Sequence, residues 1–165
     1  MTRKGVSLIF LGYLAVYLLP LGVRPMVIPD ETRYAQMGRE MVQSGDWIVP
    51  RLDGLRYFQK PIFGIWMHAL SIRLCGSNAF AARLPSALAV GLSAWLLGLW
   101  VRRFQGSALT ALLCVAAFLT CGEVFVVGVT CLIDSLLALF VTASMISFYR
   151  DVILSRPSKK KSLRP

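Results

Sequence analysis

The sequence predicts an all-α integral membrane protein, with about four transmembrane helices and two juxtamembrane helices in its first outer loop. Hydrophobic residues make up 56% of the 165 residues and charged residues only 16%, and the mean hydropathy is +0.65. A soluble domain is about half apolar and about a quarter charged. The apolar residues also gather in runs long enough to cross a bilayer. The composition therefore argues against a soluble enzyme, a disordered tail and a disulfide-rich secreted domain.

Four apolar segments are predicted to span the membrane, at about residues 6–23, 84–101, 107–126 and 133–150. The first two carry no charged residue, and each rises about 27 Å as a helix, enough for a thin bilayer. Pro85 is placed in the first turn of its span, where a missing N–H costs nothing. The later apolar stretch is too long for one span, so a helical hairpin is predicted, with its turn near residues 126–133 and Glu123 as a solvated boundary acid.

The first span is interpreted as a retained signal anchor, because no small-residue cleavage site follows it. Basic residues beside the spans predict the topology. Arg3 and Lys4 precede the first span, Arg102 and Arg103 follow the second, and six Lys or Arg residues follow the fourth. With four spans these groups share one side, which the positive-inside tendency assigns to the cytoplasm.

This topology divides the chain into a transmembrane region, residues 1–150, and a basic cytoplasmic tail, residues 151–165. Both termini are predicted to be cytoplasmic, and residues 24–83 form an outer loop. The net charge of +10 then reports topology and contact with lipid phosphate. No nucleic-acid partner is predicted, because DNA-binding domains combine basic charge with a soluble core.

The outer loop is too long and too polar to be a simple connector. A helix is predicted over Glu31–Ser44, because Tyr34, Met37 and Met41 recur at spacings of three and four. Gly45 ends this helix, and Asp30 lies at the position of an N-cap.

A second helix is predicted over Pro61–Leu74, which is too short to span a bilayer. Its small and polar residues, His68 and Ser71 among them, form one narrow face, and apolar side chains cover the rest. This composition favours a helix that lies in the membrane interface, with Trp66 at the level of the headgroups.

Ionisable residues cluster where the outer loop meets the spans. Asp30, Glu31 and Arg33 follow the first span, Lys60 precedes the second loop helix, and Asp134 lies at the outer mouth of the last two spans. Charges at membrane depth are costly and are functional candidates. Arg and Lys neutralise phosphate oxygens, and a carboxylate can orient or deprotonate an acceptor. The combination fits a phosphate whose lipid tail stays in the bilayer.

Each of these charges also has a purely structural interpretation. Asp30 and Asp134 can be helix caps, and Arg33 and Lys60 can be snorkelling surface charges. Arg83 is interpreted as an anchor at the membrane boundary. The four cysteines form no C-x-x-C pair, and there is one histidine, so neither a disulfide framework nor a zinc site is predicted.

Three runs of residues carry a more specific pattern. They are Asp30-Glu-Thr-Arg-Tyr-Ala, Ser44-Gly-Asp-Trp-Ile-Val-Pro-Arg-Leu-Asp-Gly-Leu-Arg-Tyr-Phe-Gln-Lys-Pro and Phe80-Ala-Ala-Arg-Leu-Pro-Ser-Ala. In order, spacing and membrane placement, over about residues 6–150, the chain resembles the N-terminal part of the polyprenyl-phosphate-dependent GT-C glycosyltransferases. Within this protein-mannosyltransferase-like family, it most resembles the aminoarabinose lipid A transferases.

The resemblance implies a GT-C fold with many transmembrane helices in the bacterial inner membrane. It implies inverting transfer of a sugar, 4-amino-4-deoxy-L-arabinose, from undecaprenyl phosphate to lipid A or a related periplasmic acceptor. Asp30 and Asp134 match the acids of the family's catalytic site, and Arg33 and Lys60 match basic residues near the donor phosphate. The remaining predicted pocket residues are Glu31, Tyr34, Tyr57 and Gln59.

The chain departs from the family pattern in two ways. The usual Phe-Glu-Lys-Pro reads Phe58-Gln-Lys-Pro here, and the glutamate is a metal ligand in the aminoarabinose transferases, so no metal is predicted at Gln59. Family members also continue with more spans and a soluble periplasmic domain. The chain is therefore predicted to be a glycosyltransferase or a fragment of one. The alternatives are a non-catalytic protein that binds lipid phosphate or regulates a full-length transferase, and a small transporter or flippase subunit.

Overall fold

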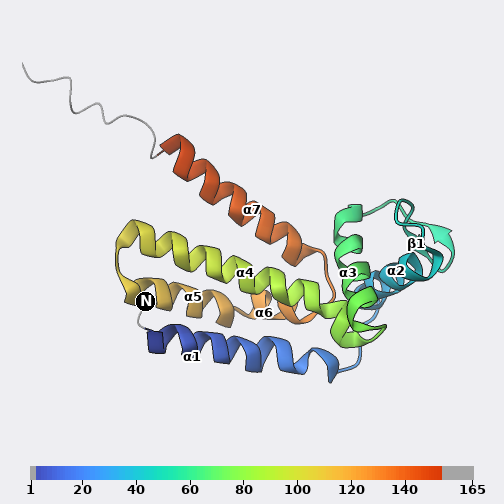
Figure 1. Ribbon diagram of the computed structural model, residues 1–165, viewed down its shortest axis with the longest axis horizontal. Coiled ribbons are helices and arrows are strands. Elements are labelled where there is room, and N and C mark those ends of the chain that lie inside the picture. The colour runs from blue at the N-terminus through green and yellow to red at the C-terminus, as the bar shows by residue number, and fades with distance from the viewer. Residues whose placement is uncertain (1–2, 154–165) are drawn as a thin grey trace, which may run out of the picture.

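A computed structural model describes residues 3–153 of the chain, and helices dominate it (Figure 1). The elements are α1 (Arg3–Tyr13), a π-helical turn (Leu14–Leu18), a 3-10 turn (Leu19–Gly22), α2 (Asp30–Ser44), β1 (Arg51–Leu52), β2 (Leu55–Arg56), α3 (Ile62–Cys75), α4 (Ala79–Gln105), α5 (Ala108–Thr120), α6 (Gly122–Val129), α7 (Asp134–Phe148) and a π-helical turn (Tyr149–Ile153). Most of the predicted basic tail, residues 154–165, lies outside the described residues.

Three helical segments in the described part of the chain are long and apolar enough to cross a membrane. They are Lys4–Gly22, Ala79–Phe104 and Asp134–Val152. The helices α5 and α6 together make a fourth candidate, bent by 65° between them. Figure 1 shows α1, α4 and α5 side by side, and α7 runs at an angle to them while packing against α4. The segment of residues 24–78, here called the α2–α3 unit, caps one end of the bundle.

The first span is tied to its neighbours by two tyrosine hydroxyl groups. Tyr13 donates to the carbonyl oxygen of Ala87 in α4, and Tyr17 donates to that of Leu119 in α5, each at 2.6 Å. The helix tightens into a 3-10 turn where Pro20 lies, because proline has no N–H for the α-helical ladder. These bonds fix the end of the span that leads into the α2–α3 unit.

The helix of the second span begins earlier than the apolar run that predicts the span. Asn78 caps α4 by accepting a hydrogen bond from the Ala81 N–H at 2.8 Å, so the helix starts at Ala79. Pro85 therefore lies inside the helix, not in its first turn as predicted. The span prediction started where continuous hydrophobicity starts, whereas the cap is set by a polar side chain six residues earlier.

The long apolar stretch after α4 breaks earlier than the predicted turn. Cys121 has extended backbone angles, with φ −64° and ψ 126°, which ends α5 and produces the bend into α6. Helix α6 continues to Val129, so only residues 130–133 separate it from α7. Glu123 is exposed in the first turn of α6.

A β-hairpin in the α2–α3 unit was missed by the all-helical prediction. Strands β1 and β2 pair antiparallel, and the turn residues Asp53 and Gly54 have φ values of 52° and 79°. Two consecutive positive φ values belong to the two-residue hairpin turn for which Asp-Gly is a strong signal. The Glu40 carboxylate on α2 accepts hydrogen bonds from the Asp53 and Gly54 N–H groups, at 2.8 and 3.2 Å, and so holds the hairpin against the helix.

The core of the α2–α3 unit forms from the apolar face predicted for the first loop helix. Tyr34, Met37 and Met41 are all buried in one cluster with residues of α3 and α4. Helix α3 turns its small and polar face inward, where Ser71 donates to the Ala81 carbonyl oxygen at 2.6 Å. Trp66 is 37% exposed on the other face.

Gly64 lets α3 approach the segment between α6 and α7. A Cβ at this position would collide with the side chain of Ile133. We expect Gly64→Ala to destabilise the fold by about 1–3 kcal/mol, because overpacking a close contact forces backbone shifts. Gly12→Ala is a matched control in a helix with open space around its Cβ. Thermal unfolding in detergent micelles would show the difference, and equal melting temperatures for both variants would contradict this packing.

Candidate functional site

The predicted catalytic acid Asp30 lies at the start of α2, where the chain leaves the first span. It is the first helical residue, and Pro29 occupies the N-cap position in its place. Its side chain is 60% exposed and lies 3.4 Å from the Arg33 guanidinium. A hydrogen-bonding cap role for Asp30 is therefore not observed, and its carboxylate faces solvent beside a cation.

Tyr34 stands at the centre of the predicted charges. The Lys60 ammonium interacts with the Tyr34 hydroxyl group, and the carboxylates of Asp30 and Asp134 are close enough to act on it electrostatically. Burial raises the pKa of Tyr34, both carboxylates add to the rise, and the Lys60 charge opposes it. The fold thus brings together residues that are 104 positions apart in the sequence.

Asp134 joins this group because α7 begins there. It is the first residue of the helix and is exposed. The segment before it, residues 130–133, packs against both α2 and α4. Asp30 and Asp134 therefore each occupy the first position of a helix at the same end of the bundle.

Of the other predicted pocket residues, Tyr57 is partly buried against the cluster that contains Tyr34, and Gln59 is exposed. A polar hollow of about 370 Å³ lies between α2 and the hairpin. Arg33 and Asp53 contribute to its lining. The Arg33 guanidinium thus borders both Asp30 and an open polar space.

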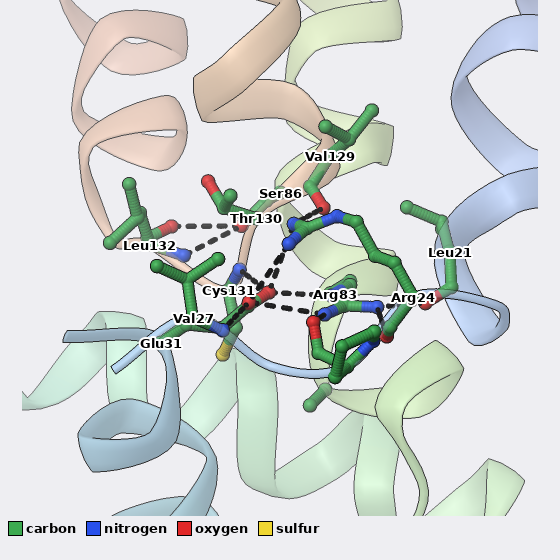
Figure 2. A network of polar contacts seen from close by, with 12 residues as sticks. Leu21, Arg24, Val27, Glu31, Arg83, Ser86, Val129, Thr130, Cys131 and Leu132 are labelled. Atoms are coloured by element: carbon green, nitrogen blue, oxygen red, sulfur yellow. Dashed lines mark hydrogen bonds and ion pairs between the residues drawn. The ribbon is translucent and has the colours of Figure 1, made fainter. Parts of the chain in front are cut away.

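Glu31 is predicted to line an open pocket, but the structure places it in the interior. It is only 2% exposed, and its carboxylate is the centre of a buried network (Figure 2). Arg83 donates to both carboxylate oxygens, at 2.5 and 3.1 Å, and the N–H groups of Val27 and Cys131 donate at 2.8 and 3.0 Å. A carboxylate with this many donors has no face left for a substrate.

The prediction that Arg83 anchors the helix at a membrane boundary is also wrong. The residue is fully buried and uses all five of its N–H donors. Besides the two bonds to Glu31, it donates to the carbonyl oxygens of Leu21, Arg24 and Pro25. The physical reason is that α4 begins at Ala79, before the apolar run. Arg83 therefore lies within the helix and faces the chain that leaves the first span.

The network also reaches the segment that leads to Asp134. Arg24 lies 3.4 Å from the Glu31 carboxylate and donates to the Val129 carbonyl oxygen at 2.7 Å. Ser86 on α4 donates to the Leu132 carbonyl oxygen at 2.8 Å. Figure 2 shows these contacts converging from α4 and from the segments next to α2 and α7.

The network predicts how stability depends on pH. Burial alone would raise the pKa of Glu31, but the hydrogen bonds from Arg83, Val27 and Cys131 and the Arg83 charge together lower it below the ordinary value of 4.5. A lowered pKa in the folded protein stabilises the fold above the unfolded-state pKa, and this stability is lost as pH falls through the folded-state pKa. We expect the melting temperature to fall below about pH 4.5, with a smaller fall in Glu31→Gln.

The residues at the site do not form a set of metal ligands. Within residues 3–153 there is no group of three or more His, Cys, Asp or Glu side chains placed to hold a metal ion. The exposed amide of Gln59 stands where the family pattern has a carboxylate. The donor set of the described residues does not fit a divalent metal.

His68 is a buried structural residue. Its Nδ1 donates to the Ala82 carbonyl oxygen at 2.7 Å, and burial lowers its pKa to about 4, so the ring stays neutral near pH 7. Its Nδ1 atom lies 3.5 Å from the Cys131 sulfur, so the ring packs against the segment of residues 130–133.

The sequence of the chain decides its family. Residues 4–163 match the family described as dolichyl-phosphate-mannose-protein mannosyltransferase. The chain belongs to this family. Membership of this mannosyltransferase family confirms the resemblance on which the GT-C prediction rests.

Curated relatives narrow the resemblance within the mannosyltransferase family. An undecaprenyl phosphate-alpha-4-amino-4-deoxy-L-arabinose arabinosyl transferase from Aeromonas hydrophila is 42% identical over 149 residues, 90% of this chain and 27% of the relative. A protein of the same name from Yersinia enterocolitica is 43% identical over 150 residues, 88% of this chain and 26% of the relative. The chain thus spans about a quarter of the length of the curated relatives it matches.

Solved structures show the same architecture. The crystal structure of ArnT from Cupriavidus metallidurans in the apo state superposes with a TM-score of 0.82 at 32% identity, over 90% of this chain and 28% of ArnT. The structure of the same protein bound to undecaprenyl phosphate also gives a TM-score of 0.82, over 88% of this chain. These likenesses confirm the all-α membrane fold predicted from the sequence.

Proposed function

We propose that the chain carries the site at which a membrane glycosyltransferase takes a sugar from a polyprenyl phosphate. The observation that carries the proposal is the gathering of Asp30, Asp134 and Lys60 around Tyr34, with Arg33 beside Asp30. Cations at the end of a membrane bundle suit a phosphate whose tail lies in lipid. An exposed carboxylate next to them suits the acceptor.

The proposed reaction displaces the lipid phosphate from the sugar. An acceptor oxygen forms a bond to the anomeric carbon, and the bond from that carbon to the phosphate oxygen breaks, so the phosphate leaves with the electron pair. Lys60 and Arg33 stabilise the charge on the departing phosphate. Asp30 orients the acceptor and takes its proton if the acceptor is a hydroxyl group. An anionic phosphate acceptor needs orientation only. Asp134 completes the acidic side of the site.

The names of the relatives support the donor and the sugar. The matched relatives are named as transferases of 4-amino-4-deoxy-L-arabinose from undecaprenyl phosphate, and we assign this donor to the chain. Lipid A or a related lipid is the proposed acceptor. The spans then lie in the inner membrane, with both termini in the cytoplasm and the α2–α3 unit in the periplasm.

A second candidate function is binding of the lipid phosphate without transfer. Binding requires only the cations Arg33 and Lys60, which lie beside Asp30 and Tyr34 and suit a phosphate whether or not transfer follows. In this role the chain would bind the donor lipid or regulate a full-length transferase.

Expression in Gram-negative cells that lack their own arabinosyl transferase separates the two functions. Mass spectrometry of lipid A from these cells is expected to show the aminoarabinose modification. Insertion is checked by membrane fractionation. A correctly inserted chain that gives no modified lipid A would contradict transfer by this chain. Reduced modification in cells that also make a full-length transferase would support the regulatory role.

A further inference from the structure

The buried carboxylate of Glu31 is connected to both acidic residues of the proposed site, Asp30 and Asp134. Glu31 follows Asp30 in the first turn of α2. Its Oε1 atom accepts the hydrogen bond from the Cys131 N–H, three residues before Asp134. A single buried side chain thus connects segments 100 residues apart.

Stability alone does not account for a buried charge pair at this position. Removing a carboxylate and a guanidinium from water is costly, and apolar residues of similar volume are often equally or more stabilising. A salt bridge differs from an apolar contact because its hydrogen bonds have direction. Here they terminate on main-chain groups of several segments, which an apolar pair could not orient.

The directions of these bonds define one rigid junction. Arg83 holds three main-chain carbonyl groups where the chain leaves the first span, those of Leu21, Arg24 and Pro25. Glu31 holds the Val27 and Cys131 N–H groups. Every donor of Arg83 and both oxygens of Glu31 are engaged, so neither residue can turn without breaking several bonds.

The segment of residues 130–133 is held from three further directions. Arg24 binds the Val129 carbonyl group, Ser86 bonds to both the carbonyl and the N–H group of Leu132, and His68 lies beside the Cys131 sulfur. Helix α7 crosses α4 at an angle (Figure 1) and packs along it, although most of its side chains are exposed. The packing holds the body of α7 against α4, and the bonds to residues 130–133 fix where the helix begins relative to α2.

We propose that the Glu31–Arg83 pair is a positioning unit that sets where Asp134 stands relative to Asp30, without touching substrate. That this spacing matters for catalysis rests on the proposed function. The placement of α7 relative to α2 does not depend on that function, and it can be measured in the absence of any activity.

Spin-label distances test the claim. The four native cysteines are replaced, Cys131 by Ala and the others by Ser, and nitroxide labels are attached at Gln43→Cys on α2 and Leu137→Cys on α7. Both native side chains are exposed, and neither belongs to the proposed site. Double electron–electron resonance in lipid nanodiscs then gives the distribution of distances between the two helices.

We expect one narrow distribution in the parent protein. In Glu31→Gln it is expected to broaden or to gain a second, shifted component, because the amide cannot accept from all the same donors. A purely stabilising role would lower the melting temperature and leave the distribution unchanged. Glu40→Gln is the control, because it removes another hydrogen-bonded carboxylate of the same helix, one that bonds to the hairpin and not to the segment before α7, and it should not change the distribution.

Arg24→Gln provides a milder variant in case Glu31→Gln does not fold. It removes the bond to Val129 and the contact with Glu31, but it leaves the Glu31–Arg83 pair intact, and it should also broaden the distribution. Folded Glu31→Gln with the parent distribution would overturn the proposal. If Glu31→Gln cannot be folded, an unchanged distribution in Arg24→Gln would overturn it. Changed distances in a chain that shows no transfer would leave the positioning role intact while contradicting the catalytic proposal.

Discussion

Asp30→Asn is expected to reduce the transfer of aminoarabinose to lipid A by about 10²–10⁴-fold, the usual contribution of a positioned acid or base. The substitution keeps the size of the side chain and removes its charge. Asp30 is 60% exposed and forms no cap, so folding should be little affected. The measurement is the ratio of modified to unmodified lipid A, by mass spectrometry, in cells that depend on this protein for the modification.

Asp53→Asn is the matched control for this prediction. Asp53 is also an exposed aspartate of the α2–α3 unit, and asparagine tolerates its positive φ of 52°. The ratio of modified to unmodified lipid A should stay at the level given by the unsubstituted protein. Equal activity of Asp30→Asn and Asp53→Asn, at equal amounts in the membrane, would exclude Asp30 from catalysis.

Arg83→Met should destabilise the fold by about 3–5 kcal/mol, because it leaves the Glu31 carboxylate buried without its partner. It also strands three main-chain carbonyl groups that Arg83 now satisfies. Thermal unfolding in detergent micelles would show the loss as a lowered melting temperature. Arg56→Met removes an exposed arginine from β2 and should stay within about 0.5 kcal/mol of the parent.

A double variant separates the charge from the packing. Glu31→Met with Arg83→Met should recover much of the loss, because no buried charge then lacks a partner. The same loss in the double variant would show that packing around the pair, and not the unpaired carboxylate, controls stability. A single Arg83→Met variant as stable as Arg56→Met would contradict the buried network itself.

The sequence was sufficient for features that depend on local periodicity. The apolar spacing of Tyr34, Met37 and Met41 correctly predicts the buried face of α2. Length and hydropathy locate the apolar segments. The charged positions Asp30, Arg33, Lys60 and Asp134 were selected by residue type and by family resemblance, and their grouping near Tyr34 depends on the fold.

The sequence was insufficient where a residue's role is set by a distant partner. Glu31 and Arg83 are 52 positions apart, and nothing local to either shows that they pair. The residue that could have indicated this placement is the N-cap Asn78. It starts α4 before Arg83 and so places Arg83 within the first turns of the helix. The hairpin also has a local sequence signal, the turn Asp53-Gly54.

The central claim is that the end of the bundle where Lys60 and Asp30 lie binds the phosphate of a polyprenyl lipid. Titration with undecaprenyl phosphate, followed by native mass spectrometry, measures this binding directly. Lys60→Gln is expected to weaken it about 10- to 100-fold, the loss of one charge-assisted hydrogen bond. Lys4→Gln, an exposed lysine at the start of the first span, should leave the affinity unchanged. Equal affinity of the two variants, or equally tight binding of undecaprenol without its phosphate, would contradict the claim.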